Sequence, residues 1–161
     1  MVTRKNNRRK KLDRKENRKV RNATKVSAHG ITFKSKLEKM VYETLVEEGL
    51  NPKYEPITYT VWKGFRPTVP SYERSTKTKK LELAVKKLID IRYTPDFILE
   101  YDGVTAIIEA KGKENELFPM RKKLFLGLLE KMPNTIYFVV RTKKETLEAI
   151  EIIKQYANEN N

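Results

Sequence analysis

The dipeptide Asp102-Gly103 stands between two β-rich runs, 97–101 and 104–110, and it constrains the fold more than any other feature of the chain. Two adjacent residues that tolerate positive φ are typical of the two-residue loop of a type I′ hairpin. A loop of that length fixes the register, because Tyr101 must then pair with Val104 and every further pair follows. The sequence therefore predicts an antiparallel hairpin in which the facing residues can be named.

That register places Asp96 directly opposite Glu109, on one face of the hairpin, with Cβ atoms roughly 5 Å apart. Like charges in this position destabilise a sheet, and a divalent cation would compensate them because hard cations take carboxylate oxygens. Lys111 follows Glu109 by two residues and so returns to the same face. The opposite face, directed into the core, is expected to carry Val104, Ala106, Ile108 and Ala110. In a chain that is 35% charged, an ordinary solvated face is the alternative, and the register favours a metal site.

The remaining elements are predicted from periodicity and from start and stop signals. Apolar residues at helical spacing predict helices over 32–48, 81–89 and 119–132, and a capping box at Thr142 and Glu145 opens a last helix. Strands are predicted over 56–62, 91–93 and 136–140, of which the last is a continuous apolar run typical of a strand covered on both faces. The order describes an α/β fold with a mixed central β-sheet flanked by helices on both faces.

Residues 1–30 form a strongly basic arm. They hold 12 Lys or Arg against two acids, a balance of +10, whereas residues 31–161 contribute only +4 to the net charge of +14. A segment with so little apolar content cannot bury enough surface to fold alone, and its expected partner is nucleic acid, held through counterion release. A solubilising tail or binding to anionic lipid remains the alternative. We expect residues 31–161 to form the folded domain.

Composition excludes several classes of protein. The chain has no cysteine, which rules out disulfides and thiolate metal sites and suits a reducing compartment. No apolar run approaches the roughly 20 residues that span a bilayer, and no apolar stretch follows the basic N-terminus as in a secretory signal. We therefore expect an intracellular protein without a membrane partner.

Two strings of residues then resemble a known family. Tyr93-Thr94-Pro95-Asp96-Phe97, followed by Glu109-Ala110-Lys111-Gly112 after an apolar strand, is similar to the motif of the PD-(D/E)XK nuclease superfamily. Upstream, residues 33–38 resemble the helix that carries a further acidic residue in the phage endonuclease I family of Holliday junction resolvases. The resemblance covers roughly residues 31 to 141. The stretch from Glu55 to Tyr93 is longer than that family leads us to expect.

The resemblance implies a restriction-endonuclease-like fold and a Mg²⁺-dependent endonuclease, with Mn²⁺ as a substitute. Asp96, Glu109 and the carbonyl of Ala110 would hold the metal, Lys111 would orient the attacking water, and Glu38 would complete the set. Glu38 has a second explanation, because Ser35-x-x-Glu38 is also a helix capping box. The substrate would be DNA, branched DNA among the candidates, in the cytoplasm of a phage-infected bacterial host. Paired cuts in a junction would favour a homodimer.

Other residues carry weaker signals. His29, the one histidine, is expected to be a linker residue rather than a general base. The basic triplet 121–123 could clamp phosphates or form a solvated helix face. Gly112 is expected to end its strand, where it could let the backbone approach DNA. Three aromatic residues could stack on bases, although core packing is the simpler expectation: Trp62, Phe65 and Tyr72.

Two other functions fit the same residues. A nuclease fold that has lost catalysis could serve DNA packaging or genome organisation, with the basic arm supplying affinity. A nuclease directed at RNA is the second. Incubation with plasmid, branched DNA and RNA, in Mg²⁺ or in EDTA, separates these functions from a DNA endonuclease.

Overall fold

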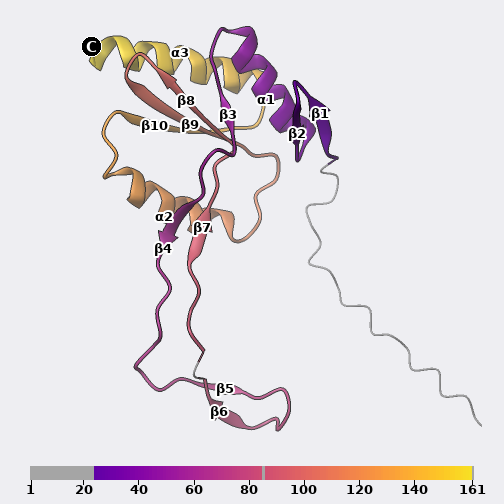
Figure 1. The fold of residues 1–161 in the computed structure, drawn as a ribbon, viewed down its shortest axis with the longest axis vertical. Helices are drawn as coiled ribbons and strands as arrows, with labels where there is room; N and C mark the ends of the chain where they lie inside the picture. Colours follow the sequence, from indigo (N-terminus) through magenta and orange to yellow (C-terminus); the bar gives the residue numbers. More distant parts are fainter. Residues whose placement is uncertain (1–23, 85, 161) are drawn as a thin grey trace, which may run out of the picture.

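A computed structural model describes residues 24–84 and 86–160, so most of the expected basic arm lies outside the described residues. Its elements, in chain order, are β1 (Val26–Ala28), β2 (Ile31–Phe33), α1 (Lys36–Glu47), β3 (Lys53–Tyr54), β4 (Tyr59–Trp62), β5 (Tyr72–Arg74), β6 (Leu81–Leu83), β7 (Ile91–Tyr93), β8 (Phe97–Tyr101), β9 (Val104–Ala110), α2 (Phe118–Leu129), β10 (Thr135–Val140) and α3 (Lys143–Asn160). They form a mixed α/β body from which a thin two-stranded extension projects (Figure 1).

The central sheet has the order β10-β9-β8-β3, with β10 parallel to β9 and the other pairs antiparallel. Its middle pair is the predicted hairpin. Asp102 and Gly103 have φ of 43° and 79°, as a type I′ turn requires, and the register runs from Tyr101↔Val104 to Phe97↔Ile108. The predicted pairing of the two runs is confirmed.

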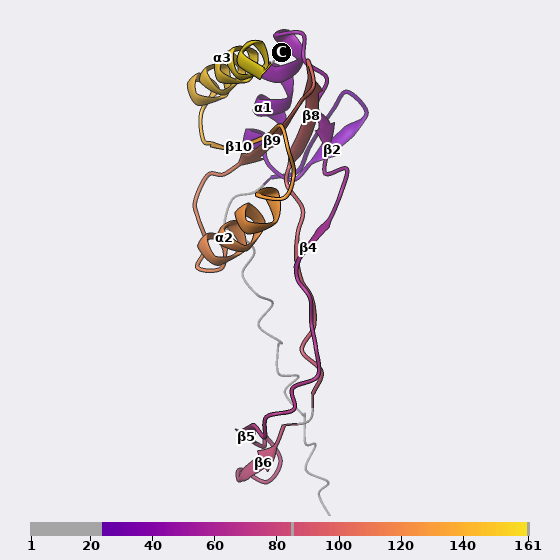
Figure 2. The same ribbon diagram turned by 90° about the vertical axis from the view of Figure 1, so that its left-hand side faces the viewer.

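Helices cover both faces of this sheet, as expected. On one face the buried side chains of α1 and α3, such as Val41 and Ile150, pack against Leu99, Ala106 and Ile108. On the other face α2 packs through Phe125 and Leu129 against Ile98 and Ile107, as the two views show (Figures 1 and 2). Even the edge strand β10 is covered on both sides, by contacts with one cluster through Ile136 and Phe138 and with the other through Tyr137 and Val139.

The starts of α1 and α3 follow the predicted signals, whereas α2, expected over 119–132, already ends at Leu129. The Ser35 hydroxyl caps α1 by accepting from the Glu38 N–H at 3.1 Å, and Gly49, with φ of 80°, follows its end. The Thr142 side chain likewise accepts from the Glu145 N–H at 3.1 Å before α3. The helix expected over 32–48 is shorter at its N-terminus, because Thr32 and Phe33 pair with β1 in a small hairpin. The domain boundary placed at residue 30 falls inside that hairpin.

The helix expected over 81–89 is wrong. Leu81 to Leu83 form β6 and pair with β5, and residues 84 and 86–90 run without regular secondary structure. The apolar residues of this segment have no core to face, since Leu81 and Ile89 are 72% and 82% exposed. The apolar spacing alone could not show that this segment lies away from the body.

The extension consists of residues 63–90 and joins the body through β4 and β7 (Figure 2). Its two strands approach closely at Gly64, whose N–H donates to Asp90 Oδ1 at 2.9 Å; farther out, the Leu88 N–H donates to the Phe65 carbonyl at 2.9 Å. A Cβ at Gly64 would lie 2.1 Å from the Leu88 carbonyl oxygen. Only glycine allows this spacing of the strands.

We predict that Gly64→Ala separates the two strands of the extension, because the added methyl group would overlap backbone atoms that cannot rotate away. Amide hydrogen exchange should accelerate across 63–90 while β8 and β9 keep their protection. Gly127→Ala is the matched control: a Cβ there meets nothing within 4 Å, and the change should be neutral or add up to about 1 kcal/mol to helix stability. Unchanged exchange in Gly64→Ala would contradict the close approach.

Candidate metal centre and basic cleft

Asp96 lies between β7 and β8, directly beside β9. Its Oδ2 accepts from the Ala110 N–H at 2.8 Å, and its own carbonyl accepts from the Glu55 N–H at 2.8 Å. The β8–β9 register, continued by one pair beyond Phe97↔Ile108, sets Asp96 opposite Glu109 on the face that α2 covers. The structure therefore places Asp96 opposite Glu109, as predicted. At Ala110 it shows the N–H donating to Asp96, whereas the prediction was that the Ala110 carbonyl holds a metal.

Glu109 is buried, with 6% exposure, and three polar side chains are arranged around it. Its Oε2 accepts from the Tyr93 hydroxyl at 2.8 Å, and its Oε1 lies 3.3 Å from Nζ of Lys111. A further 2.8 Å hydrogen bond joins the hydroxyls of Tyr93 and Tyr137. Lys111 is positioned from the other side by Phe118, whose ring centroid is 4.3 Å from Nζ. The predicted trio of two acids and one lysine is thus assembled on one face.

Electrostatics within this group are unfavourable for two negative charges. Burial raises the pKa of Asp96 to about 8, with a further contribution from the nearby charges of Glu109 and Glu38. Burial also raises the pKa of Glu109, against the hydrogen bond from Tyr93 and the charge of Lys111. A cation between the two carboxylates would relieve their repulsion. The chemistry of the donor set therefore fits a hard divalent ion.

Glu38 reaches the same neighbourhood from α1, where the capping explanation holds. Its Oε1 accepts from the Ser35 hydroxyl at 2.8 Å, and its Oε2 accepts from the Lys34 N–H at 2.9 Å and from the Tyr54 hydroxyl at 2.6 Å. The charge of Glu38 nevertheless acts on both Asp96 and Glu109. Within residues 24–84 and 86–160, no three Asp, Glu, His or Cys side chains already enclose a cation position.

A cleft with a volume of about 230 Å³ opens beside Glu109 and Lys111. Its wall adds three further cations, Lys34, Arg92 and Arg121, and one further acid, Glu55, which is paired with Lys34. Of the basic triplet 121–123, only Arg121 lines it. Four cations around two acids suit a polyanionic ligand better than a neutral one.

Sequence reasoning missed the tyrosines of the site. Tyr93 and Tyr137 come from β7 and β10, and only the parallel pairing of β10 with β9 and the path of β7 bring them to Glu109. Burial raises the pKa of both phenols above the ordinary tyrosine value, so they remain protonated donors. A polar ring on an otherwise apolar strand, as at Tyr137, was the one signal in the sequence.

The weaker candidates take other places. His29 lies in the β1–β2 turn, where its Nε2 is 3.5 Å from the Glu43 carboxylate, and it does not line the cleft beside Glu109. Gly112 follows the end of β9, as expected. Trp62 contacts Phe65 edge-on, but Phe65 and Tyr72 are 51% and 62% exposed on the extension, so core packing is wrong for these two.

We predict that Asp96→Asn stabilises the fold in a pH-dependent way. The pKa of Asp96 is raised in the folded chain from its ordinary 3.8 to about 8, so protonation stabilises the fold and that contribution is lost as the pH rises through this window. The melting temperature of Asp96→Asn should match wild type near pH 4 and exceed it by several degrees near pH 8.

The control for this experiment is Glu100→Gln, an exposed acid of the same hairpin, which should track wild type throughout. Added Mg²⁺ should raise the melting temperature of wild type more than that of Asp96→Asn, because only the wild type keeps both carboxylates. Parallel curves for wild type and Asp96→Asn from pH 4 to pH 8 would contradict the raised pKa.

Comparison with known proteins gives one match. No curated protein and no solved structure matches the chain. No helix in the described part of the chain is long and apolar enough to cross a membrane. The model of the family described as "Protein of unknown function (DUF1064)" matches residues 17–147, which include every residue of the site. The chain therefore belongs to the DUF1064 family.

Proposed function

We propose that the chain is a metal-dependent endonuclease that hydrolyses phosphodiester bonds in DNA. One observation carries the proposal. Glu109, which is buried, and Asp96, which is partly buried, have raised pKa values and share a face of the sheet with Lys111, and Glu109 and Lys111 line a cationic cleft. The mixed sheet with helices on both faces is compatible with the restriction-endonuclease-like fold that the sequence motif implies. The proposed setting is the cytoplasm of a phage-infected bacterium.

Asp96 and Glu109 would hold Mg²⁺ or Mn²⁺, with the carbonyl of Ala110 and the carboxylate of Glu38 as further ligands. The bound ion would supply Lewis-acid polarisation of the scissile phosphate and a more acidic water. Hydrolysis forms a bond from a water oxygen to phosphorus and breaks one phosphorus–oxygen ester bond. Because both carboxylates are negatively charged, a cation would bind between them more favourably than a phosphate group without a cation.

Other side chains of the site have separate tasks. Lys111, which is positioned by Glu109 and Phe118, stabilises the negative charge that develops on the phosphate as the new bond forms. Tyr93 and Tyr137 fix the orientation of Glu109 as a chain of donors. Arg92 and Arg121, on the cleft wall, bind the neighbouring phosphates.

A catalytically silent DNA-binding protein is the second candidate. It is favoured by the hydrogen bonds that already engage the carboxylates of Glu38 and Glu109. The two candidates share the cleft and its cations. They differ in whether Mg²⁺ produces strand cleavage.

We predict that Asp96→Asn and Glu109→Gln abolish Mg²⁺-dependent cleavage and leave DNA binding equal or stronger, since each removes a negative charge that faces phosphate. Lys111→Ala should lower the cleavage rate by about 10²- to 10³-fold with little loss of fold. Glu100→Gln, the same acid-to-amide change outside the site, should keep full activity.

The measurement is cleavage of plasmid, branched DNA and RNA in Mg²⁺ and in EDTA, beside binding assays in EDTA. Full activity of Asp96→Asn would place hydrolysis elsewhere in the chain. Binding without any cleavage by wild type would leave the silent DNA-binding protein, and cleavage confined to RNA would change the substrate class.

A further inference from the structure

The extension is not needed to complete the core of the body. None of its described residues, 63–84 and 86–90, belongs to either buried cluster. Its strands are held to each other by the contacts at Gly64 and Phe65, by a hydrogen bond from the Ala84 N–H to the Ser71 carbonyl at 2.7 Å, and by the β5–β6 pairing. Because this segment is ordered but adds nothing to the core, we expect it to bind a partner molecule.

The charge of the extension points to a polyanion. Residues 63–90 contain eight Lys or Arg against three acids, a balance of +5 in 28 residues. Residues 31–161 together have a balance of only +4, so the rest of the domain is close to neutral and the excess is concentrated here. A second copy of a chain with net charge +14 would be repelled by this segment, whereas a phosphate backbone would be attracted.

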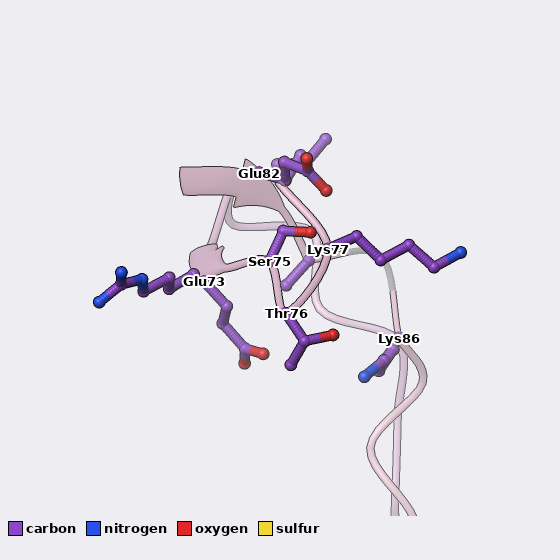
Figure 3. A pocket seen from close by; sticks show the side chains of 9 residues that line it. Glu73, Ser75, Thr76, Lys77, Glu82 and Lys86 are labelled. Atoms are coloured by element: carbon purple, nitrogen blue, oxygen red, sulfur yellow. The ribbon is translucent and has the colours of Figure 1, made fainter. Parts of the chain in front are cut away.

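Several cations of the extension line hollows on its surface, and one of these hollows shares a residue with the cleft. Arg92 lines both the cleft and a second hollow, which Lys87 also lines. A third hollow, of about 440 Å³, lies at the tip beside the β5–β6 turn. Its charged lining residues are three cations, Arg74, Lys77 and Lys86, and two acids, Glu73 and Glu82. Figure 3 shows Ser75, Thr76 and Lys77 on that turn and Lys86 on the neighbouring segment. Each hollow thus carries at least one cation.

The extension reaches at most about one turn of duplex DNA beyond the body. From Trp62, at the end of β4, to Tyr72, at the start of β5, the chain advances ten residues. An extended chain covers at most about 33 Å over that number of residues. One turn of B-DNA is about 34 Å. The tip therefore lies within about one turn of a duplex that leaves the cleft along the extension.

We propose that the extension guides a duplex arm of the DNA substrate away from the cleft. Its basic track consists of Arg74, Lys77, Lys86, Lys87 and Arg92, which contact backbone phosphates over about one turn. The proposal rests on DNA as the ligand of the cleft and adds the form of the substrate: the scissile position must be flanked, on one side, by roughly 10 base pairs of duplex. Phosphate contacts of this kind position the DNA and do not read its sequence.

The test is DNA binding by the full-length chain, in EDTA, to duplexes from about 8 to about 24 base pairs. Affinity of the wild type should rise steeply as the duplex exceeds about one turn and then level off. The track variant Lys77→Ala/Lys86→Ala/Lys87→Ala should lose that rise. On long duplexes the slope of log K against log salt should be shallower by about 2 to 3 units, since each phosphate contact contributes about 0.9.

The matched control is Lys131→Ala/Lys143→Ala/Lys144→Ala, which removes the same number of exposed lysines from the body. Lys143 pairs with Glu47 at the surface, a contact of little weight in stability. This variant should retain the dependence on duplex length and the wild-type salt slope. On the shortest duplex all three proteins should bind alike.

Each outcome separates the track from the nuclease. A track variant that follows wild type at every length, while wild type binds and cleaves DNA, overturns the track alone. A length dependence that the track variant loses, without cleavage by wild type in Mg²⁺, supports the track and overturns the endonuclease. A wild-type dimer without DNA, dissociated by the track variant with an unchanged salt slope, would make a second copy the partner and overturn the track.

Discussion

The pairing of β8 with β9 is the constraint on which the rest of the site depends. The backbone at Asp102 and Gly103 fixes the register, and the register decides that Glu109 and Lys111 face α2 while Ala106 and Ile108 face α1 and α3. A slip of one residue would turn all of β9 over relative to β8. The acids would then lie in the wrong layer, and apolar residues of the core would be exposed in the cleft.

Placing two carboxylates, the buried Glu109 and the partly buried Asp96, on one face of the sheet costs folding free energy, and the surroundings offset only part of that cost. The Ala110 N–H, the Tyr93 hydroxyl and the Lys111 ammonium donate to them, yet the pKa values of Asp96 and Glu109 remain raised. The body tolerates this because well-packed helices cover both faces of the sheet. Acids whose pKa values stay raised by burial and by each other's charge are typical of a functional centre.

The features that depend on a few neighbouring residues were predicted correctly from the sequence. The hairpin register, the capping of α1 and α3 and the apolar strand β10 follow from short stretches of sequence and were found. The pairing of β3 with β8 and the Tyr93–Tyr137 contact join distant segments, and no short pattern encodes them. The helix expected over 81–89 failed for a related reason: its spacing is helical, but the tip has no surface against which an apolar stripe could pack.

The extension is attached to the body only through β4 and β7, so its length can change without disturbing the body. Beyond the β4–β7 pairs, no described residue of the extension takes part in the core, and doubling such a loop costs only about 0.6 kcal/mol in closure entropy. Insertions or deletions of two residues on each strand would preserve the facing of its side chains. The packing of the core therefore sets no length for this segment, and a difference in length among DUF1064 relatives would fall here while the sheet stays constant.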